Sequence, residues 1–138
     1  MVEIIFPPVF LGSPRQKGEG LRIGTVRRPP RGVAKDRFAA DDWYDVWYPE
    51  LSPSAELVKL ALAATTDKEW AAFVRAFRKE MDAPAARHTL DLLAALSHSA
   101  DLSVGCYCEN ENRCHRSVLR KILEEREATI AWSPTPTQ

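Results

Sequence analysis

Cysteine is scarce in this sequence, with three residues among 138. So small and odd a number excludes a disulfide framework of the kind that stabilises small secreted domains. We therefore expect reduced thiols and a cytoplasmic location. The N-terminal residues include Glu3 and no basic cluster, so they do not have the pattern of a secretory signal.

A long apolar run is also absent. No stretch without a charged side chain is longer than 11 residues, and one of that length, residues 4–14, contains three prolines. A helix that spans a bilayer needs about 20 apolar residues, so we expect no membrane partner.

Net charge is absent as well, because 19 basic residues balance 19 acidic ones. The overall charge therefore indicates neither nucleic acid nor an anionic surface as a partner. The distribution is uneven, however. Residues 1–40 contain eight basic and three acidic side chains, a net charge of +5, whereas residues 41–58 contain five acidic side chains and no basic one. Either the two segments neutralise each other on the surface, or the basic segment faces an anionic ligand.

What is present is the composition of an ordinary globular domain. Hydrophobic residues make up 45% of the chain and charged residues 28%, which are typical values. The length suits one domain. We expect it over residues 1–132, followed by a disordered tail over residues 133–138.

Four segments have the pattern of β-strands. They are residues 2–6, 21–26 and 102–108, with a shorter one at 129–132. Pro7 and Pro8 are expected to end the first strand, because proline cannot donate to a sheet ladder. The 102–108 segment is almost wholly apolar, as expected for a buried parallel strand.

Four helices are predicted from start signals and apolar spacing. The first begins at Pro53 with Ser52 as its cap, and the second follows a capping box formed by Thr66 and Glu69. The third begins at Pro84, and the fourth begins near Cys114. The order of elements indicates a single α/β domain, with a mostly parallel central sheet and helices packed on its faces.

Three irregular segments of this domain are of functional interest. Polar residues 27–37 and 108–116 follow predicted strands, and ligands bind at the carboxyl ends of parallel strands. We expect these two segments to meet there. The aromatic-rich residues 43–54 are expected to cover the core, and a platform for base stacking is the alternative.

Four blocks of sequence occur in the order and spacing of a known family. They are TVRRPPRGVAK at residues 25–35, DVWYPELSPSAEL at 45–57, EWAAFVRAFRKEM at 69–81 and GCYCENENRCHRSVL at 105–119. On these blocks the chain, from about Leu21 to Glu124, resembles the domain-of-unknown-function 488 family, also called YeaO-like. The resemblance implies a small bacterial α/β protein, whose activity the family name leaves open.

Two motifs of that family bear on the site. Members usually carry an aspartate ahead of a Pro-Arg-Gly turn; Arg27 and residues 30–32 match this element, but Thr25 and Val26 stand near the position of the aspartate. If that acid is catalytic in relatives, this chain lacks it. The Cys-His-Arg triplet matches at residues 114–116. Some members keep only its histidine, which argues against a purely cysteine-based mechanism for the family at large.

The interpretation that we favour for residues 106–117 is an anion site. The free N–H groups and positive dipole end of a helix that begins near Cys114 suit a phosphate. Arginine can fork onto such an anion, and histidine can exchange a proton near neutral pH. The expected partner is a small anionic ligand or nucleotide, or a nucleic-acid end. The predicted ligand-binding residues are Arg27, Arg31, Arg113, Arg116 and Ser117, and the catalytic candidates are His115, Cys114 and Cys108.

A rhodanese-like thiol site is one alternative. A strand that ends in Cys108, followed by a short loop, Arg113 and a helix, has the spacing of such a site. That loop contains no glycine, and Glu109 and Glu111 would repel a thiolate or a bound anion.

A metal site is another alternative. Cys106 and Cys108 share one face of a strand, and with Cys114 and His115 they could complete a tetrahedral zinc site. Adjacent ligands at a helix start diverge by about 100°, however, so we expect no cofactor. In the simplest alternative these residues are buried hydrophobes and helix caps. A non-catalytic module that binds nucleic acid or protein through the basic segment is the competing function class.

Overall fold

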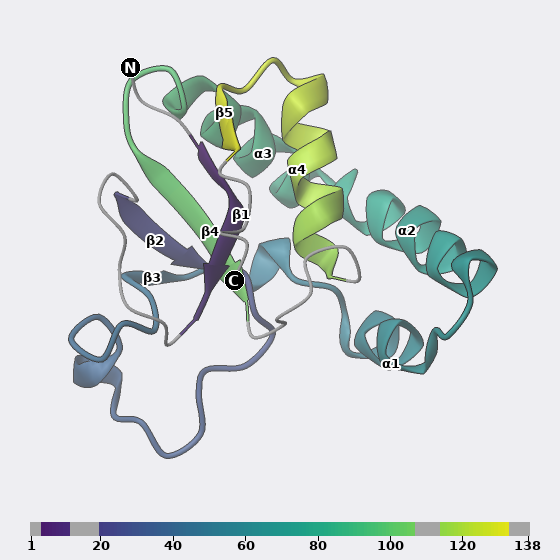
Figure 1. Cartoon of the computed structure of the whole chain (residues 1–138), viewed down its shortest axis with the longest axis horizontal. Coiled ribbons are helices and arrows are strands. Elements are labelled where there is room, and N and C mark those ends of the chain that lie inside the picture. The colour runs from purple at the N-terminus through teal and green to yellow at the C-terminus, as the bar shows by residue number, and fades with distance from the viewer. Residues whose placement is uncertain (1–3, 12–19, 107–113, 133–138) are drawn as a thin grey trace.

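The computed structural model describes residues 4–11, 20–106 and 114–132. They form a sheet of five strands in the order β3-β2-β4-β1-β5, and every pair of neighbours is parallel (Figure 1). The strands are β1 (Ile4–Phe10), β2 (Leu21–Gly24), β3 (Val46–Trp47), β4 (Leu102–Cys106) and β5 (Ile130–Trp132). The helices are α1 (Ala55–Ala63), α2 (Asp67–Met81), α3 (Pro84–Leu96) and α4 (His115–Glu125), with short 3-10 helices η1 (Lys35–Arg37) and η2 (Pro49–Leu51). The predicted α/β class is confirmed. The predicted tail, residues 133–138, lies outside the described residues.

The prediction that Pro7 and Pro8 end the first strand is wrong. Strand β1 continues to Phe10, and its register against β4 shifts between Ile5 and Val9. The two prolines fall within this irregularity, where no regular ladder bond requires an N–H group. An interruption of this kind is how a strand with neighbours on both sides accommodates proline.

The predicted start of the first helix is wrong by two residues. The cap of α1 is Ser54, not Ser52, and its hydroxyl accepts a hydrogen bond from the Leu57 N–H at 3.3 Å. The Ser52 hydroxyl instead donates to the carbonyl of Pro49 within the preceding turn. The backbone is extended at both serines, but the Ser52 hydroxyl is engaged by Pro49, and the Ser54 hydroxyl is the one that caps the helix.

The predicted capping box of α2 is confirmed. The Thr66 hydroxyl accepts from the Glu69 N–H, and the Glu69 carboxylate accepts from the Thr66 N–H, both at 3.1 Å. Hydrogen bonds from Thr65 and Thr66 lower the pKa of Glu69. Phe73 and Phe77 follow on the buried face of the helix.

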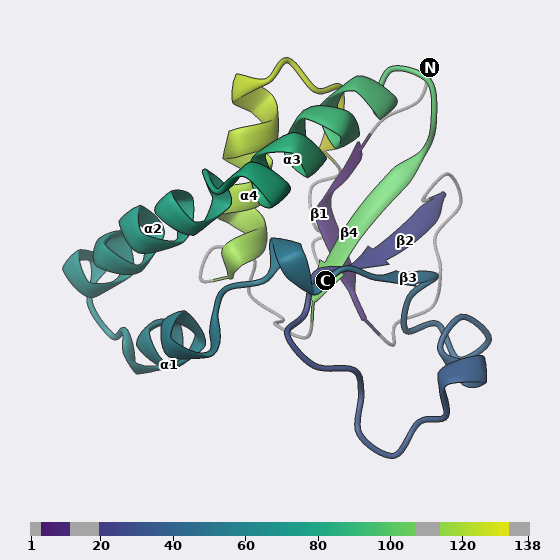
Figure 2. The same ribbon diagram turned by 180° about the vertical axis from the view of Figure 1, so that it is seen from behind.

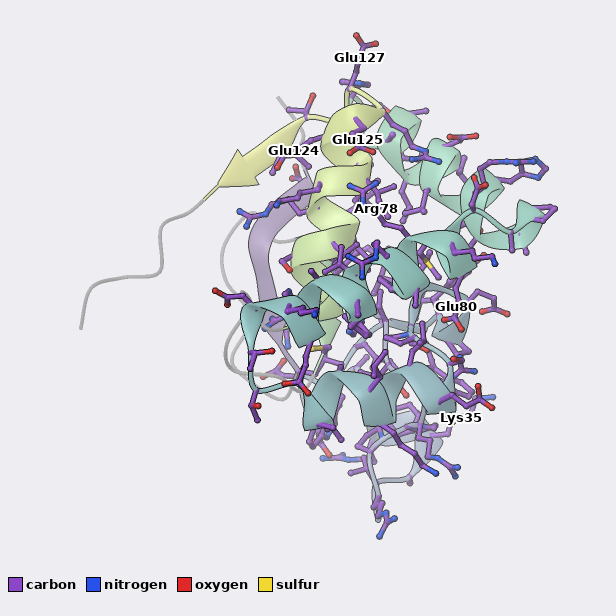
Figure 3. The ribbon with its side chains drawn as sticks, turned by 90° about the vertical axis from the view of Figure 1, so that its right-hand side faces the viewer. Lys35, Arg78, Glu80, Glu124, Glu125 and Glu127 are labelled. Carbon is purple, nitrogen blue, oxygen red and sulfur yellow. The ribbon has the colours of Figure 1, made fainter. Side chains whose placement is uncertain are left out.

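The main hydrophobic core lies between one face of the sheet and the helices. Ile23, Leu102 and Val104 supply the sheet side, and α2, α3 and α4 supply the other side. Helices α3 and α4 lie side by side in both views (Figures 1 and 2). An exposed ion pair between Arg78 and Glu125, at 2.8 Å, also joins α2 to α4 (Figure 3), and this hydrogen bond lowers the pKa of Glu125. In the part of the chain that the structure describes, no helix is long and apolar enough to cross a membrane.

The other face of β2 is covered by part of the aromatic-rich segment. Arg22 is fully buried, and its guanidinium donates to the carbonyl of Asp42. Its backbone N–H donates to the Asp45 carboxylate at 2.8 Å. Both contacts join the basic residues 1–40 to the acidic residues 41–58. Tyr44 lies so close to Gly24 that a Cβ there would approach the tyrosine ring to 2.4 Å.

We expect Gly24→Ala to lower the free energy of unfolding by about 3 kcal/mol, because the new methyl group overpacks the contact with the buried Tyr44 ring. Gly32→Ala is the matched control. Gly32 has a φ of +73° and open space around its Cβ position, so only backbone strain of about 1 kcal/mol is expected there. Urea denaturation measures both values. Equal losses of unfolding free energy in the two variants would contradict the close approach of Tyr44 to Gly24.

Candidate functional site

The sheet topology predicts where a ligand binds. Strands β2 and β4 are neighbours, but β2 leads to β3 on one side whereas β4 leads through α4 to β5 on the other. The crevice outside the carboxyl ends of two such strands is the usual ligand site of an open α/β sheet. Thr25 directly follows β2, and it contacts His115, the first residue of α4. The end of β2 therefore meets the start of α4, whereas the predicted meeting of residues 27–37 with residues 108–116 stays a prediction.

The hydrogen bonds of His115 define its tautomer. The ring is buried, and its Nε2 lies 2.7 Å from the carbonyl oxygen of Thr25 and 3.1 Å from the Thr25 hydroxyl. A carbonyl oxygen can only accept, so Nε2 carries the hydrogen. The threonine hydroxyl in turn donates to the carbonyl of Gly105. In the neutral ring the lone pair is then on Nδ1.

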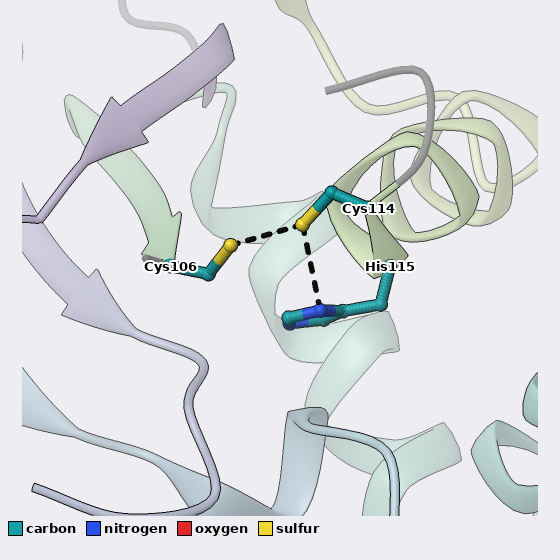
Figure 4. Close-up of side chains that lie close together, drawn as sticks. All are labelled: Cys106, Cys114 and His115. Atoms are coloured by element: carbon teal, nitrogen blue, oxygen red, sulfur yellow. Dashed lines mark hydrogen bonds between the residues drawn. The ribbon is translucent and has the colours of Figure 1, made fainter. Parts of the chain in front are cut away.

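Cys114 lies at the N-terminus of α4, and its sulfur is in contact with three side chains. The Sγ atom lies 3.6 Å from Nδ1 of His115 and 2.9 Å from Sγ of Cys106 (Figure 4). It also accepts a hydrogen bond from Nε of Arg116 at 3.3 Å. Cys106 and Cys114 are both buried, and no disulfide joins them in the described part of the chain. A guanidinium donor and a helix N-terminus favour the ionised form of such a sulfur.

The ligand atoms of Cys106, Cys114 and His115 all lie within 4.8 Å of one another. Cys114 and His115 do not diverge as neighbouring residues within a helix do. Cys114 is the N-cap, with an extended backbone at φ −128° and ψ 149°. Its side chain therefore does not follow the helical rotation between neighbours. Cys108, the fourth predicted ligand, lies outside the described residues.

The structure gives Arg116 and Ser117 contacts with Cys114 itself. The Arg116 side chain is 2% exposed, and its bond to the Cys114 sulfur is described above. The Ser117 hydroxyl donates to the carbonyl of Cys114 at 2.9 Å. These contacts orient the cysteine from within the helix.

The predicted ligand-binding arginines of residues 27–37 lie on the surface. Arg27 is exposed, and its Nε and Nη2 atoms both donate to the carbonyl of Pro53, at 3.1 and 3.0 Å. Arg27 is two residues from Thr25, which places the start of residues 27–37 near the carboxyl end of β2. Arg31 is also exposed. Arg113 lies outside the described residues.

Two residues of the site were not predicted as functional from the sequence. Thr25 holds His115, and the available signals were its position after a strand and its place near the family's aspartate. Tyr44 belongs to the same buried cluster as Cys106 and Cys114. Its hydroxyl is buried and has no hydrogen-bond partner among the described residues. Burial raises the pKa of Tyr44, so the hydroxyl keeps its proton and is available as a donor.

A comparison with protein families matches residues 8–127 to a model described as the Active DUF488-N3 subclade. The chain belongs to the DUF488 family. The matched region of this DUF488 chain contains every contact described above, from Thr25 to Ser117. No curated protein and no solved structure matches it significantly.

In this DUF488 chain we expect Tyr44→Phe to raise the free energy of unfolding by about 1 kcal/mol, because it removes a buried hydroxyl without a partner in the described structure. Tyr48→Phe is the control. The Tyr48 hydroxyl lies 2.7 Å from that of Thr89, so its loss should lower stability by about 1 kcal/mol. Chemical denaturation of both variants is the test. Destabilisation by Tyr44→Phe would show that its hydroxyl has a partner.

Proposed function

We propose that this DUF488 chain carries out thiol chemistry on a compact anionic ligand. In this proposal Cys114 is the nucleophile and His115 is the base that removes its proton. The exposed side chains of Arg27 and Arg31 attract the anionic group of the ligand. The observation that supports the proposal most directly is the hydrogen bond between His115 Nε2 and the Thr25 carbonyl, because it turns the Nδ1 lone pair toward the Cys114 sulfur.

The three side chains have separate tasks. A thiol is weakly nucleophilic until it loses its proton, and an imidazole lone pair at 3.6 Å can accept that proton. The Arg116 N–H then stabilises the thiolate by a charge-assisted hydrogen bond. Because Arg116 is buried against the sulfur, we assign it to the thiolate. The sequence had predicted it as a ligand clamp.

The charge of the segment after β2 supports an anionic ligand. Residues 27–37 contain five basic side chains and one acidic one. The segment begins at the carboxyl end of β2, where the topology predicts a ligand. A phosphate-bearing molecule such as a nucleotide or a nucleic-acid end has the matching chemistry. The description of the matched subclade as active agrees with a site that performs a reaction.

Two agents that alkylate thiols by the same reaction but differ in charge test this proposal. Iodoacetate is an anion and iodoacetamide is neutral, so the ratio of their rates at Cys114 reports the local attraction of anions. Peptide mapping by mass spectrometry locates the modified cysteine. Both sulfurs are buried, so absolute rates are slow, and the ratio is compared with that of the unfolded chain.

We expect Cys114 to prefer iodoacetate in the folded chain relative to the unfolded one. Arg27→Ala and Arg31→Ala should each reduce this preference about threefold, which is the effect of one charge at roughly 7 Å in water. His115→Ala should slow both reagents by about tenfold or more. The control is Arg78→Ala, an exposed arginine of α2 that is paired with Glu125, which should keep the parent's ratio. Equal ratios in the folded and unfolded chains would refute anion attraction at Cys114.

A further inference from the structure

Cys106 is a buried thiol that the proposed reaction does not use. It lies at the end of β4, and its sulfur is 2.9 Å from that of Cys114. We propose that Cys106, Cys114 and His115 bind a divalent metal ion of the zinc type, with a fourth position that no other described residue fills. This inference shares Cys114 and His115 with the proposed function. A bound metal ion therefore blocks the Cys114 nucleophile reversibly.

The donor set is the one that zinc prefers, two sulfurs and one imidazole nitrogen. A tetrahedral zinc ion separates a sulfur from a nitrogen ligand by roughly 3.6 Å, and two sulfurs by roughly 3.8 Å. The Cys114 sulfur and His115 Nδ1 are 3.6 Å apart. The two sulfurs must therefore separate by roughly 0.9 Å from their present 2.9 Å when the ion enters.

The surroundings of the three ligands are those of a metal site. A histidine that binds a metal usually donates its other ring N–H to a carbonyl or carboxylate, which orients the ring. His115 makes such a bond to Thr25 and leaves Nδ1 for the ion. The Arg116 N–H donates to the Cys114 sulfur, as outer-shell donors do for metal thiolates.

Charge and burial also favour a cation between the sulfurs. All three side chains are buried, with exposures of 1% to 9%. Two thiolates this close together in a buried place would repel each other. A divalent ion with two thiolates is neutral, which removes that repulsion. The Tyr44 hydroxyl, in the same cluster and without a partner among the described residues, is available as a donor to a ligand at the fourth position.

The consequence for the reaction follows from the ligand set. With the ion bound, the Cys114 lone pair and the His115 Nδ1 lone pair are both coordinated. The thiolate is then a ligand, and the base has no lone pair with which to accept a proton. Removal of the metal restores both groups.

The test is titration of the reduced, metal-free full chain with Co²⁺ under anaerobic conditions. We expect one equivalent to bind, with sulfur-to-cobalt charge-transfer bands and the visible absorption of tetrahedral cobalt, and Zn²⁺ to displace it. Cys106→Ser should weaken binding by at least about 100-fold, because loss of outer-shell partners alone costs 10- to 100-fold. His98→Ala, which removes a surface histidine bonded to Thr129, is the control and should bind as the parent does.

A second measurement on the parent covers the case in which Cys106→Ser fails to fold. One equivalent of Zn²⁺ should protect both Cys106 and Cys114 from alkylation, as peptide mapping would show. Absence of tetrahedral Co²⁺ absorption, or protection of neither cysteine, would overturn the metal site. The iodoacetate preference is measured on the metal-free chain, so failure of the metal site leaves it standing. Loss of that preference with intact Co²⁺ binding refutes the thiol proposal alone.

Discussion

The hydrogen bond from His115 Nε2 to the carbonyl of Thr25 connects residues 90 positions apart in the chain. It joins the end of β2 to the start of α4, at the carboxyl ends of two neighbouring parallel strands. It also selects the histidine tautomer, which turns the Nδ1 lone pair toward Cys114. The thiol chemistry and the metal site both depend on that lone pair.

The burial of polar side chains around this site is unfavourable, and the rest of the fold offsets it. Arg22, Arg116 and Thr25 are almost fully buried, and buried polar groups destabilise a protein unless they are hydrogen-bonded. Arg22 and Thr25 bond to backbone carbonyls, and Arg116 bonds to the Cys114 sulfur. The large core formed by the sheet and helices α2, α3 and α4 supplies the stability that lets this polar cluster persist. Tyr44, whose hydroxyl has no partner in the described structure, is the kind of locally unfavourable group that function retains.

Local signals account for what the sequence predicted well. The capping box at Thr66 and Glu69 and the helix that begins after Cys114 involve residues a few positions apart, so the pattern alone identifies them. The α/β class followed from the order of such elements. The bond between Thr25 and His115 depends instead on strand order, which is a property of the whole sheet. The convergence of Cys114 and His115 depended on the extended backbone of the N-cap, which spacing along the sequence does not reveal. The continuation of β1 past Pro7 and Pro8 required the register shift against β4.

The protonation state of His115 tests the account most directly. Long-range ¹H–¹⁵N correlation spectroscopy of the ¹⁵N-labelled, metal-free chain distinguishes the two neutral tautomers of each histidine. We predict that the neutral ring of His115 carries its hydrogen on Nε2 and its lone pair on Nδ1, whereas exposed His88 shows signals averaged over both tautomers. A proton on Nδ1 of His115 would contradict the account, because that nitrogen could then neither accept the Cys114 proton nor bind a metal ion.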